Sequence, residues 1–299
     1  MAKIAVELEQ ALTQRRITGA PGEARSRVIA RSRQWRVADV LCTSGPQDRP
    51  FEECHHEVSI AMVLAGAFQY RAAANHRTKH ELMTPGSLML GGPGQCFECG
   101  HNHGEGDRCI SFWYSPDYFE RIAADAGVRS PRTNFRELRV PALSDLTPLI
   151  TTACVGMLHS PVTAWEELSL KLAGLAAQLV NGIPERGFEL PPSSHARISH
   201  VVRLIDDDPT ASWSLSSLAQ EAKLSPYHFL RTFEQVAGVT PHQYTLRTRL
   251  REAALRLASE SDKILDVALD SGFGDVSNFN RAFRSEFGMS PRAFRAQHN

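Results

Sequence analysis

The chain has 299 residues, a length that favours two domains, and its hydrophobic content of 42% is enough for ordinary buried cores. Lys plus Arg and Asp plus Glu balance at 33 each, so the composition excludes a uniformly basic nucleic-acid-binding protein and leaves room only for a local basic patch. No run of about 18 apolar residues is present, which argues against a membrane span.

The first segment, MAKIAVELEQALTQRR, predicts a short helix or a loose tail. It lacks the long apolar core of a signal peptide. We therefore expect a cytoplasmic protein, in which the six cysteines stay mostly reduced.

Residues 50–115 predict a small β-barrel or sandwich. Apolar runs such as VSIAMVLAGAFQYRA are followed by Pro-Gly and Gly-Gly turns in LMTPGSLMLGGPGQCFECG, and CISFWYS adds a further strand. A helical pattern comes next. SPDYFERIAADAG has a Ser cap and a Gly stop, and residues 143–181 predict two helices divided near Pro161.

The second of these helices has leucines at spacings of four, three and four, the pattern of a coiled-coil seam over two heptads. Two interpretations fit: the helix packs on its own barrel, or it makes a dimer contact that charged residues at Leu172 and Leu175 would break. The stripe consists of Trp165, Leu168, Leu172, Leu175 and Leu179. After it, NGIPERGFELPPSSH, residues 181–195, is rich in Gly, Pro and Ser and predicts an interdomain linker.

One pattern occurs twice in the C-terminal third. QEAKLSPYHFLRTFEQVAGVTPHQY, residues 220–244, and DSGFGDVSNFNRAFRSEFGMSPRAF, residues 270–294, share their Phe, Arg, Gly and Pro positions at an offset of 50. Each copy predicts a helix, a short turn and a second helix. Two copies are too few for a solenoid, so a pair of related helical subdomains fits better.

The second helix of each copy has one apolar and one polar face at 100° per residue. The phenylalanines anchor the helix in a small core. The polar face offers long donors that a DNA major groove accepts, although a merely solvated face is the ordinary alternative. The polar-face residues are Tyr227, His228, Arg231 and Gln235 in the first copy and Ser277, Asn278, Arg281, Arg284 and Ser285 in the second.

Residues from about 196 to 299 resemble the DNA-binding domain of the AraC/XylS family of bacterial transcription regulators, most specifically in DVALDSGFGDVSNFNRAFRSEFGMSPRAFR. The resemblance implies two helix-turn-helix units joined by a long helix, with both recognition helices in the major groove of one duplex. It also implies the residues that touch DNA, which are Tyr227, Leu230 and Arg231 in the first helix and Val276, Ser277, Asn280 and Arg281 in the second.

The connecting helix is HQYTLRTRLREAALRLAS, with an apolar stripe of Leu246, Leu250, Ala254 and Leu257. Because this helix lies between two DNA-reading helices, we expect one or two of its arginines to contact DNA phosphates. Arg247 and Arg249 are the candidates for this contact. The arginines expected to point outward are Arg247, Arg249, Arg251 and Arg256.

The β-rich segment resembles the cupin-like sensing barrel of the same family, in HHEVSIAMVLAGAFQY and HELMTPGSLMLGGPGQCFECGH. Within it, CFECGHNHGEGDRC is unusual. If residues 97–103 are extended, their Cys and His side chains point to one side, where thiolate and imidazole suit Zn²⁺ or another soft metal. The alternative is core cysteines and a Gly-rich loop. The candidate ligands are Cys96, Cys99, His101, His103 and Cys109.

Together these patterns predict an α+β protein. Residues 1–182 form a cupin-like β-barrel with dimerisation helices, residues 183–195 a linker, and residues 196–299 an all-α domain with two helix-turn-helix units. We expect a transcription regulator and not an enzyme, since no Ser-His-Asp set or phosphate-binding Gly loop is evident. The expected partners are promoter DNA, a small effector held in the barrel, a second copy of the chain and RNA polymerase. The alternatives are a metal- or thiol-sensing regulator of the same fold and a metal-dependent cupin enzyme.

Overall fold

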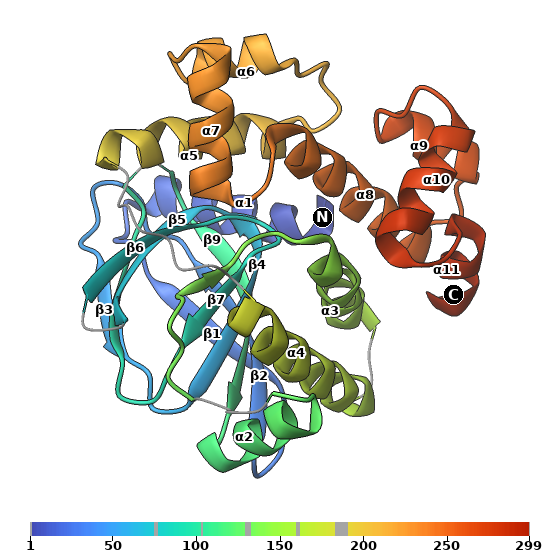
Figure 1. The fold of residues 1–299 in the computed structure, drawn as a ribbon. Helices are drawn as coiled ribbons and strands as arrows, with labels where there is room; N and C mark the ends of the chain where they lie inside the picture. Colours follow the sequence, from blue (N-terminus) through green and yellow to red (C-terminus); the bar gives the residue numbers. More distant parts are fainter. Residues whose placement is uncertain are drawn as a thin grey trace.

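The computed structural model describes residues 2–74, 77–102, 104–128, 133–159, 162–182 and 191–298 and shows an α+β protein (Figure 1). Antiparallel strands dominate the N-terminal half, a group of helices follows them in the chain, and the rest of the described chain is helical. Among the helices in these ranges, none is long and apolar enough to cross a membrane.

The strands form two sheets. The larger has the order β1-β2-β9-β4-β7-β10, and its strands in that order span Ala24–Arg31, Trp35–Cys42, Asp107–Tyr114, Val58–Gly66, Leu88–Gly91 and Arg139–Val140. The smaller has the order β3-β8-β5-β6, with strands at Phe51–Cys54, Cys96–Gly100, Phe68–Ala74 and Arg77–Met83. The strand-rich region therefore starts earlier than predicted, because β1 and β2 precede residue 50.

The two sheets pack face to face as a sandwich. Tyr70 and Met83 of the smaller sheet and Val63 and Cys109 of the larger fill the space between them. A closed barrel needs one continuous ladder of paired strands, and no ladder in the described residues joins β3 or β6 to the larger sheet. The prediction of a closed barrel is therefore wrong in this respect.

Helices cover the other face of the larger sheet. α2 (Pro116–Asp125), α3 (Thr147–His159) and α4 (Val162–Gly182) share a core with Ile60 and Phe112 of the sheet (Figure 1). The predicted division into two helices is confirmed, since α3 ends and α4 begins on either side of the break predicted near Pro161.

The leucine stripe of α4 belongs to this core. Trp165, Leu168 and Leu172 are 2%, 4% and 0% exposed, and Leu175 and Leu179 pack partly buried against the same cluster. Packing on the chain's own sheet, the first interpretation of the seam, is thus seen in the structure, and the dimer contact stays a prediction. Heptad spacing marks a buried face, whatever covers that face.

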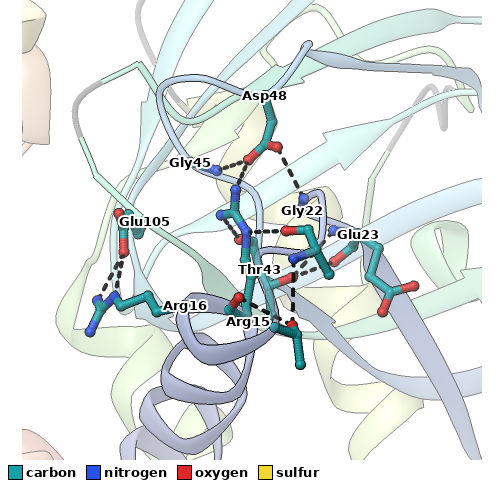
Figure 2. A network of polar contacts seen from close by, with 10 residues as sticks. Arg15, Arg16, Gly22, Glu23, Thr43, Gly45, Asp48 and Glu105 are labelled. Carbon is teal, nitrogen blue, oxygen red and sulfur yellow. Dashed lines mark hydrogen bonds and ion pairs between the residues drawn. The ribbon is translucent and has the colours of Figure 1, made fainter.

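The N-terminal segment forms the helix α1 (Ala2–Thr18), which contacts β4 and β9 and buries Leu8 and Leu12. Polar contacts fix its C-terminal end to the neighbouring loops (Figure 2). Arg15 pairs with Asp48 at 2.6 Å.

The C-terminal third consists, in the described residues, of α5 to α11. The helices in order span Pro192–Asp207, Leu215–Glu221, Pro226–Ala237, Pro241–Ser259, Ile264–Asp270, Val276–Phe287 and Pro291–His298. Most of the predicted linker, residues 183–190, lies outside the described part of the chain. Residues 192–195 of that prediction form the first turn of α5.

Local capping explains why the repeated pattern folds as predicted. Ser225 and Asp275 accept hydrogen bonds from backbone N–H groups at the starts of α7 and α10. Gly238 and Gly288 end these helices with φ of 82° and 72°, the left-handed conformation that favours glycine. The predicted order of helix, short turn and second helix in both copies is therefore confirmed.

Candidate nucleic-acid interface

Each copy of the repeat has its own aromatic core. Phe229 and Phe233 of α7 are fully buried with Tyr244 of α8. Phe279 and Phe283 of α10 are fully buried in a second cluster that also contains parts of α8 and α11. Edge-to-face and tilted ring contacts within each cluster fix the rotation of the helix about its axis. The polar face of each helix is consequently turned outward.

The outward face of α7 presents an aromatic and a basic group. Tyr227 is 65% exposed, and its ring meets the neighbouring His228 ring at 5.8 Å between centroids. Arg231 is also exposed, one turn further along. Leu230, the apolar candidate on this helix, is only partly exposed.

The outward face of α10 presents amide and guanidinium groups. Arg281 donates a hydrogen bond from Nη2 to Oδ1 of Asn278 at 3.0 Å, which holds the two side chains side by side. Ser277 and Asn280 are exposed next to them, whereas Val276 is partly exposed. Arginine and asparagine are the residue types that bind guanine and adenine edges bidentately.

The two candidate phosphate contacts of α8 are occupied inside the molecule. Arg247 donates to Glu286 at 3.1 Å and to the backbone oxygen of Ala142 at 2.7 Å. Arg249 donates to the backbone oxygens of Gly272 at 3.1 Å and of residues 209 and 211 at 2.5 Å and 3.0 Å. Both side chains therefore join parts of the fold in this structure.

Arg251 and Arg256 were also expected to point outward from α8, and one of the two does. Arg251 is 2% exposed, so its predicted position is wrong, because this side of α8 faces the N-terminal half and not solvent. Arg256 is partly exposed and pairs with three carboxylates, and together these raise its pKa despite partial burial. The carboxylates are Glu260, Asp262 and Asp270.

Residues 218–297, which hold both repeated units, match a family model described as a helix-turn-helix domain. The same third of the chain is similar to two regulators of related sequence. One is the HTH-type transcriptional regulator MtrA of Neisseria gonorrhoeae, 30% identical over 34% of this chain and 34% of its own length. The other is the HTH-type transcriptional activator RhaS of Escherichia fergusonii, 33% identical over 34% of this chain and 37% of its own.

The chain carries an AraC-type helix-turn-helix domain. This confirms the family resemblance drawn from the repeat. The match spans about a third of the length of the curated relatives, so it describes the AraC-type domain and not the β-sandwich.

Solved structures similar to the chain fall into two groups by coverage. An AraC-type DNA-binding domain protein from Chromobacterium violaceum is 28% identical with a TM-score of 0.34, over 36% of this chain and 96% of that one. ToxT from Vibrio cholerae is 14% identical with a TM-score of 0.36, over 90% of this chain and 99% of that one.

A cavity of about 800 Å³ lies between the AraC-type domain and the N-terminal half. α1 and β4 line it from one side, and α5 and α8 from the other. Its charged lining is mainly acidic, with five carboxylates against two guanidinium groups. These are Glu9, Glu105, Asp206, Asp207 and Glu252, and Arg16 and Arg203.

The structure divides the five cysteine and histidine candidates. Cys96 forms a disulfide with Cys54, so in this state it has no thiolate to offer a metal, and its prediction as a ligand is corrected. His103 lies outside the described residues. Cys99, His101 and Cys109 point into the sandwich beside Asp107.

Two partners of these residues were missed from the sequence. The carboxylate of Asp107 accepts from His101 at 2.7 Å, and the thiol of Cys42 lies in the same group. Cys42 is far away in the sequence and reaches the group because β2 pairs with β9 in the register that puts it opposite Asp107. Burial raises the pKa of the Cys42 thiol to about 11, with a further contribution from Asp107. Burial also raises the pKa of Cys99 and of Cys109.

Proposed function

We propose that the chain is a sequence-specific DNA-binding transcription regulator of the AraC type. The observation that carries the proposal is the pair of helix-turn-helix units within residues 218–297, each with a capped second helix anchored by phenylalanines. The similarity to MtrA, a transcriptional regulator, and to RhaS, a transcriptional activator, supports it. They favour regulation over the alternative of a cupin enzyme.

In this proposal α7 and α10 each read base edges in the major groove. Arg231 and Arg281 recognise guanine, and Asn280 recognises adenine, through paired hydrogen bonds. Tyr227 and His228 contact the backbone or a base at the start of α7, and Ser277 and Asn278 do so on α10. The partly exposed Leu230 and Val276 contact thymine methyl groups.

The overall charge limits how the protein finds DNA. Because the chain has a formal net charge of zero, attraction to the phosphates comes from a narrow patch on the AraC-type domain. Arg247 and Arg249 reach phosphates only if they give up the internal partners described above, so we assign them first to the fold. A small number of phosphate contacts predicts a shallow dependence of affinity on salt.

We further propose that a small effector binds in the cavity between the two halves. The space within the sandwich, where the sequence placed the effector, is filled by side chains such as Phe68 and Tyr70. The interdomain cavity is within the range of about 300–1,000 Å³ typical of ligand sites, and a molecule there would touch both halves at once. Its acidic lining favours a cationic or neutral polar effector over an anion.

Two further partners belong to the proposal. RNA polymerase is the machinery on which a transcription regulator acts, and its presence with DNA implies the cytoplasm. A homodimer would have to use a surface other than the buried stripe of α4. The outward face of that helix, where Leu170 is 40% exposed, is the surface we assign to it. Sedimentation of Leu170→Glu against the parent chain tests the assignment, and an unchanged dimer would refute it.

The experiment that tests the function is selection of duplexes from a random pool by the full-length protein. We expect enrichment of two short elements about one helical turn, ~10 base pairs, apart, one for each unit. Failure of the folded protein to enrich any sequence would overturn the proposal.

Variants of the recognition helices then assign the two elements. Arg231→Ala and Arg281→Ala should each weaken specific binding by ~1–3 kcal/mol and relax the preference in one element only. Arg25→Ala is the matched control, since this arginine is exposed on β1 of the sandwich and should leave binding unchanged. If both recognition variants bind the selected duplex like the control, α7 and α10 are not the reading helices.

A further inference from the structure

Three different metal-binding side chains meet at one end of the sandwich interior. The Cys42 thiol, the His101 imidazole and the Asp107 carboxylate each place a ligand atom within 4.8 Å of the other two. All three residues are buried, at 9%, 4% and 5% exposure. They come from β2, from the residue after β8 and from β9, so both sheets contribute to the group.

We propose that this group binds a borderline transition-metal ion, with Zn²⁺ as the best fit. A thiol and an imidazole are poor ligands for Mg²⁺ and Ca²⁺, which prefer oxygen atoms, whereas sulfur, nitrogen and carboxylate oxygen together suit tetrahedral zinc. Cys109 is the candidate for a fourth ligand: its Sγ donates a hydrogen bond to Oδ2 of Asp107 at 3.4 Å, and it would have to turn toward the other two residues to coordinate the same ion. The site goes beyond the proposed function, since DNA reading does not require it.

The geometry is close to what a tetrahedral ion requires. With bonds of about 2.0–2.3 Å, the ligand atoms of a zinc ion stand roughly 3.5 Å apart. Nε2 of His101 and Oδ1 of Asp107 are already 2.7 Å apart, and the Cys42 sulfur lies within 4.8 Å of a ring nitrogen of His101 and of a carboxylate oxygen of Asp107. An ion therefore needs the first pair to separate slightly. The Phe68 ring, 5.9 Å from the His101 ring, limits how that imidazole turns.

An ordinary buried ion pair accounts for only part of the group. It explains why His101 and Asp107 face each other, but it does not require a thiol from β2 in the same group. The Cys42 sulfur lies within 4.8 Å of ligand atoms of both residues. A metal ion gives these three groups a common partner and neutralises a carboxylate that is otherwise buried beside thiols.

The site lies at both ends of a loop that touches the AraC-type domain. His101 precedes the loop and Asp107 follows it. Within the loop, Glu105 pairs with Arg16 of α1 at 2.8 Å (Figure 2). A Cβ at Gly104 would be in van der Waals contact, at 3.4 Å, with the side chain of Arg203 on α5. An ion that fixes both ends of this loop would therefore change how α1 and α5 pack against it. This coupling between the ion and the packing of α1 and α5 rests on the proposed function, whereas the metal site itself does not.

The test is titration of full-length protein, purified without a histidine tag and kept reduced, with Co²⁺ as the probe. We expect one equivalent to give the absorption of thiolate-to-cobalt charge transfer, and Zn²⁺ to abolish it by displacement. Absence of that absorption in the folded parent protein would overturn the proposal without recourse to any variant.

Matched variants locate the ion. Cys42→Ser and His101→Gln should each weaken Co²⁺ binding by roughly 100-fold or more, since even the partners of metal ligands are worth about 10–100-fold. Cys154→Ser is the control, because this thiol is equally buried but lies in α3. The pair Cys54→Ser with Cys96→Ser removes the cysteines that reductant would free. Equal loss in these controls, with native circular dichroism, would refute the assignment.

The coupling between metal binding and DNA binding is measured separately, as the affinity of the parent protein for its selected duplex with Zn²⁺ and with a chelator. We expect the two affinities to differ in the parent protein and to be equal in Cys42→Ser. An unchanged affinity together with an intact cobalt absorption would overturn the coupling, whereas loss of the cobalt absorption overturns the site itself.

Discussion

Glu286 of α10 and Arg247 of α8 form an ion pair at 3.1 Å, and both side chains are nearly buried. The same carboxylate oxygen accepts a hydrogen bond from Thr147 of α3 at 2.6 Å, and Arg247 also donates to the backbone of Ala142. One glutamate in α10 therefore connects the AraC-type domain to the helices on the β-sandwich. The face of α10 that we propose reads DNA is held at a defined position relative to the N-terminal half.

Glu286→Gln tests this connection. The substitution leaves a nearly buried arginine without its carboxylate, so the free energy of unfolding should fall by ~1–3 kcal/mol in urea denaturation. Glu234→Gln is the control, because this glutamate is exposed on α7 and its loss should cost less than about 0.5 kcal/mol. The loss in a double variant with Thr147→Ala should be smaller than the sum of the single losses. Equal stability of the two glutamine variants would mean that the connection contributes nothing.

The repeated domain could be predicted because its signals are local. The Ser225 cap, the Gly238 stop and the phenylalanines one turn apart act within a dozen residues, and each structural boundary falls where they place it. The stripe of α4 could be found in the same way, but its partner could not. Spacing along one helix records which face is buried and says nothing about whether that face meets the same chain or a second copy.

The group around Asp107 could be predicted only in part from the sequence. Cys99 and His101 were visible as a pattern of period two, but Cys42 joins them only through strand pairing across the larger sheet. The strand β1 was not predicted, because most of its residues are exposed and it lacks the alternating apolar pattern that marks a strand. Likewise, nothing in a helical wheel distinguishes Arg249, which bonds within the fold, from an arginine that faces solvent.

Arg249→Lys separates a role in the fold from a role in phosphate binding. A lysine keeps the charge, but its donors sit on a single nitrogen and cannot span the backbone oxygens that Nε, Nη1 and Nη2 of Arg249 reach, so Arg249→Lys and Arg249→Ala should lose a similar ~1.5–3 kcal/mol of stability. A phosphate contact would instead be largely restored by lysine. Thermal or urea unfolding and duplex affinity are measured on both variants. Arg256→Lys, at a partly exposed ion-pair network, is the control and should cost less than about 1 kcal/mol. Normal stability with reduced affinity in Arg249→Ala alone would favour the phosphate contact.

Leu172→Ala tests the assignment of the α4 stripe to the core. Because Leu172 is fully buried among the helices and the larger sheet, truncation should cost ~2–5 kcal/mol in the free energy of unfolding. Leu170→Ala, on the exposed face of the same helix, should cost less than about 0.5 kcal/mol. Sedimentation is measured on the same samples. A stable Leu172→Ala protein that has become monomeric would restore the seam as a dimer contact.

Asp206 gives the folded protein a specific dependence on pH. It accepts a hydrogen bond from the Tyr244 hydroxyl at 2.9 Å, and burial raises its pKa to about 7 although Arg251 and that hydrogen bond oppose the shift. The folded state therefore holds a proton that the unfolded chain releases near its ordinary pKa of 3.8. The contribution of Asp206 to stability is complete below that value and is lost as the pH rises toward about 7. The slope is at most about 1.4 kcal/mol per pH unit.

Asp206→Asn should remove this slope, because an amide cannot ionise and can still accept from Tyr244. The difference in unfolding free energy between variant and parent, measured from pH 4 to pH 8, should grow in favour of the variant as the pH rises and level off above about 7. Asp207→Asn controls for the loss of one carboxylate at the neighbouring, exposed position. Because Asp206 also lines the cavity between the two halves, the same variant should bind a cationic effector more weakly at pH 8 than the parent does, with little difference at pH 5 where both are neutral at this position. A parallel pair of stability curves over the whole range would show that Asp206 is ionised in the folded state.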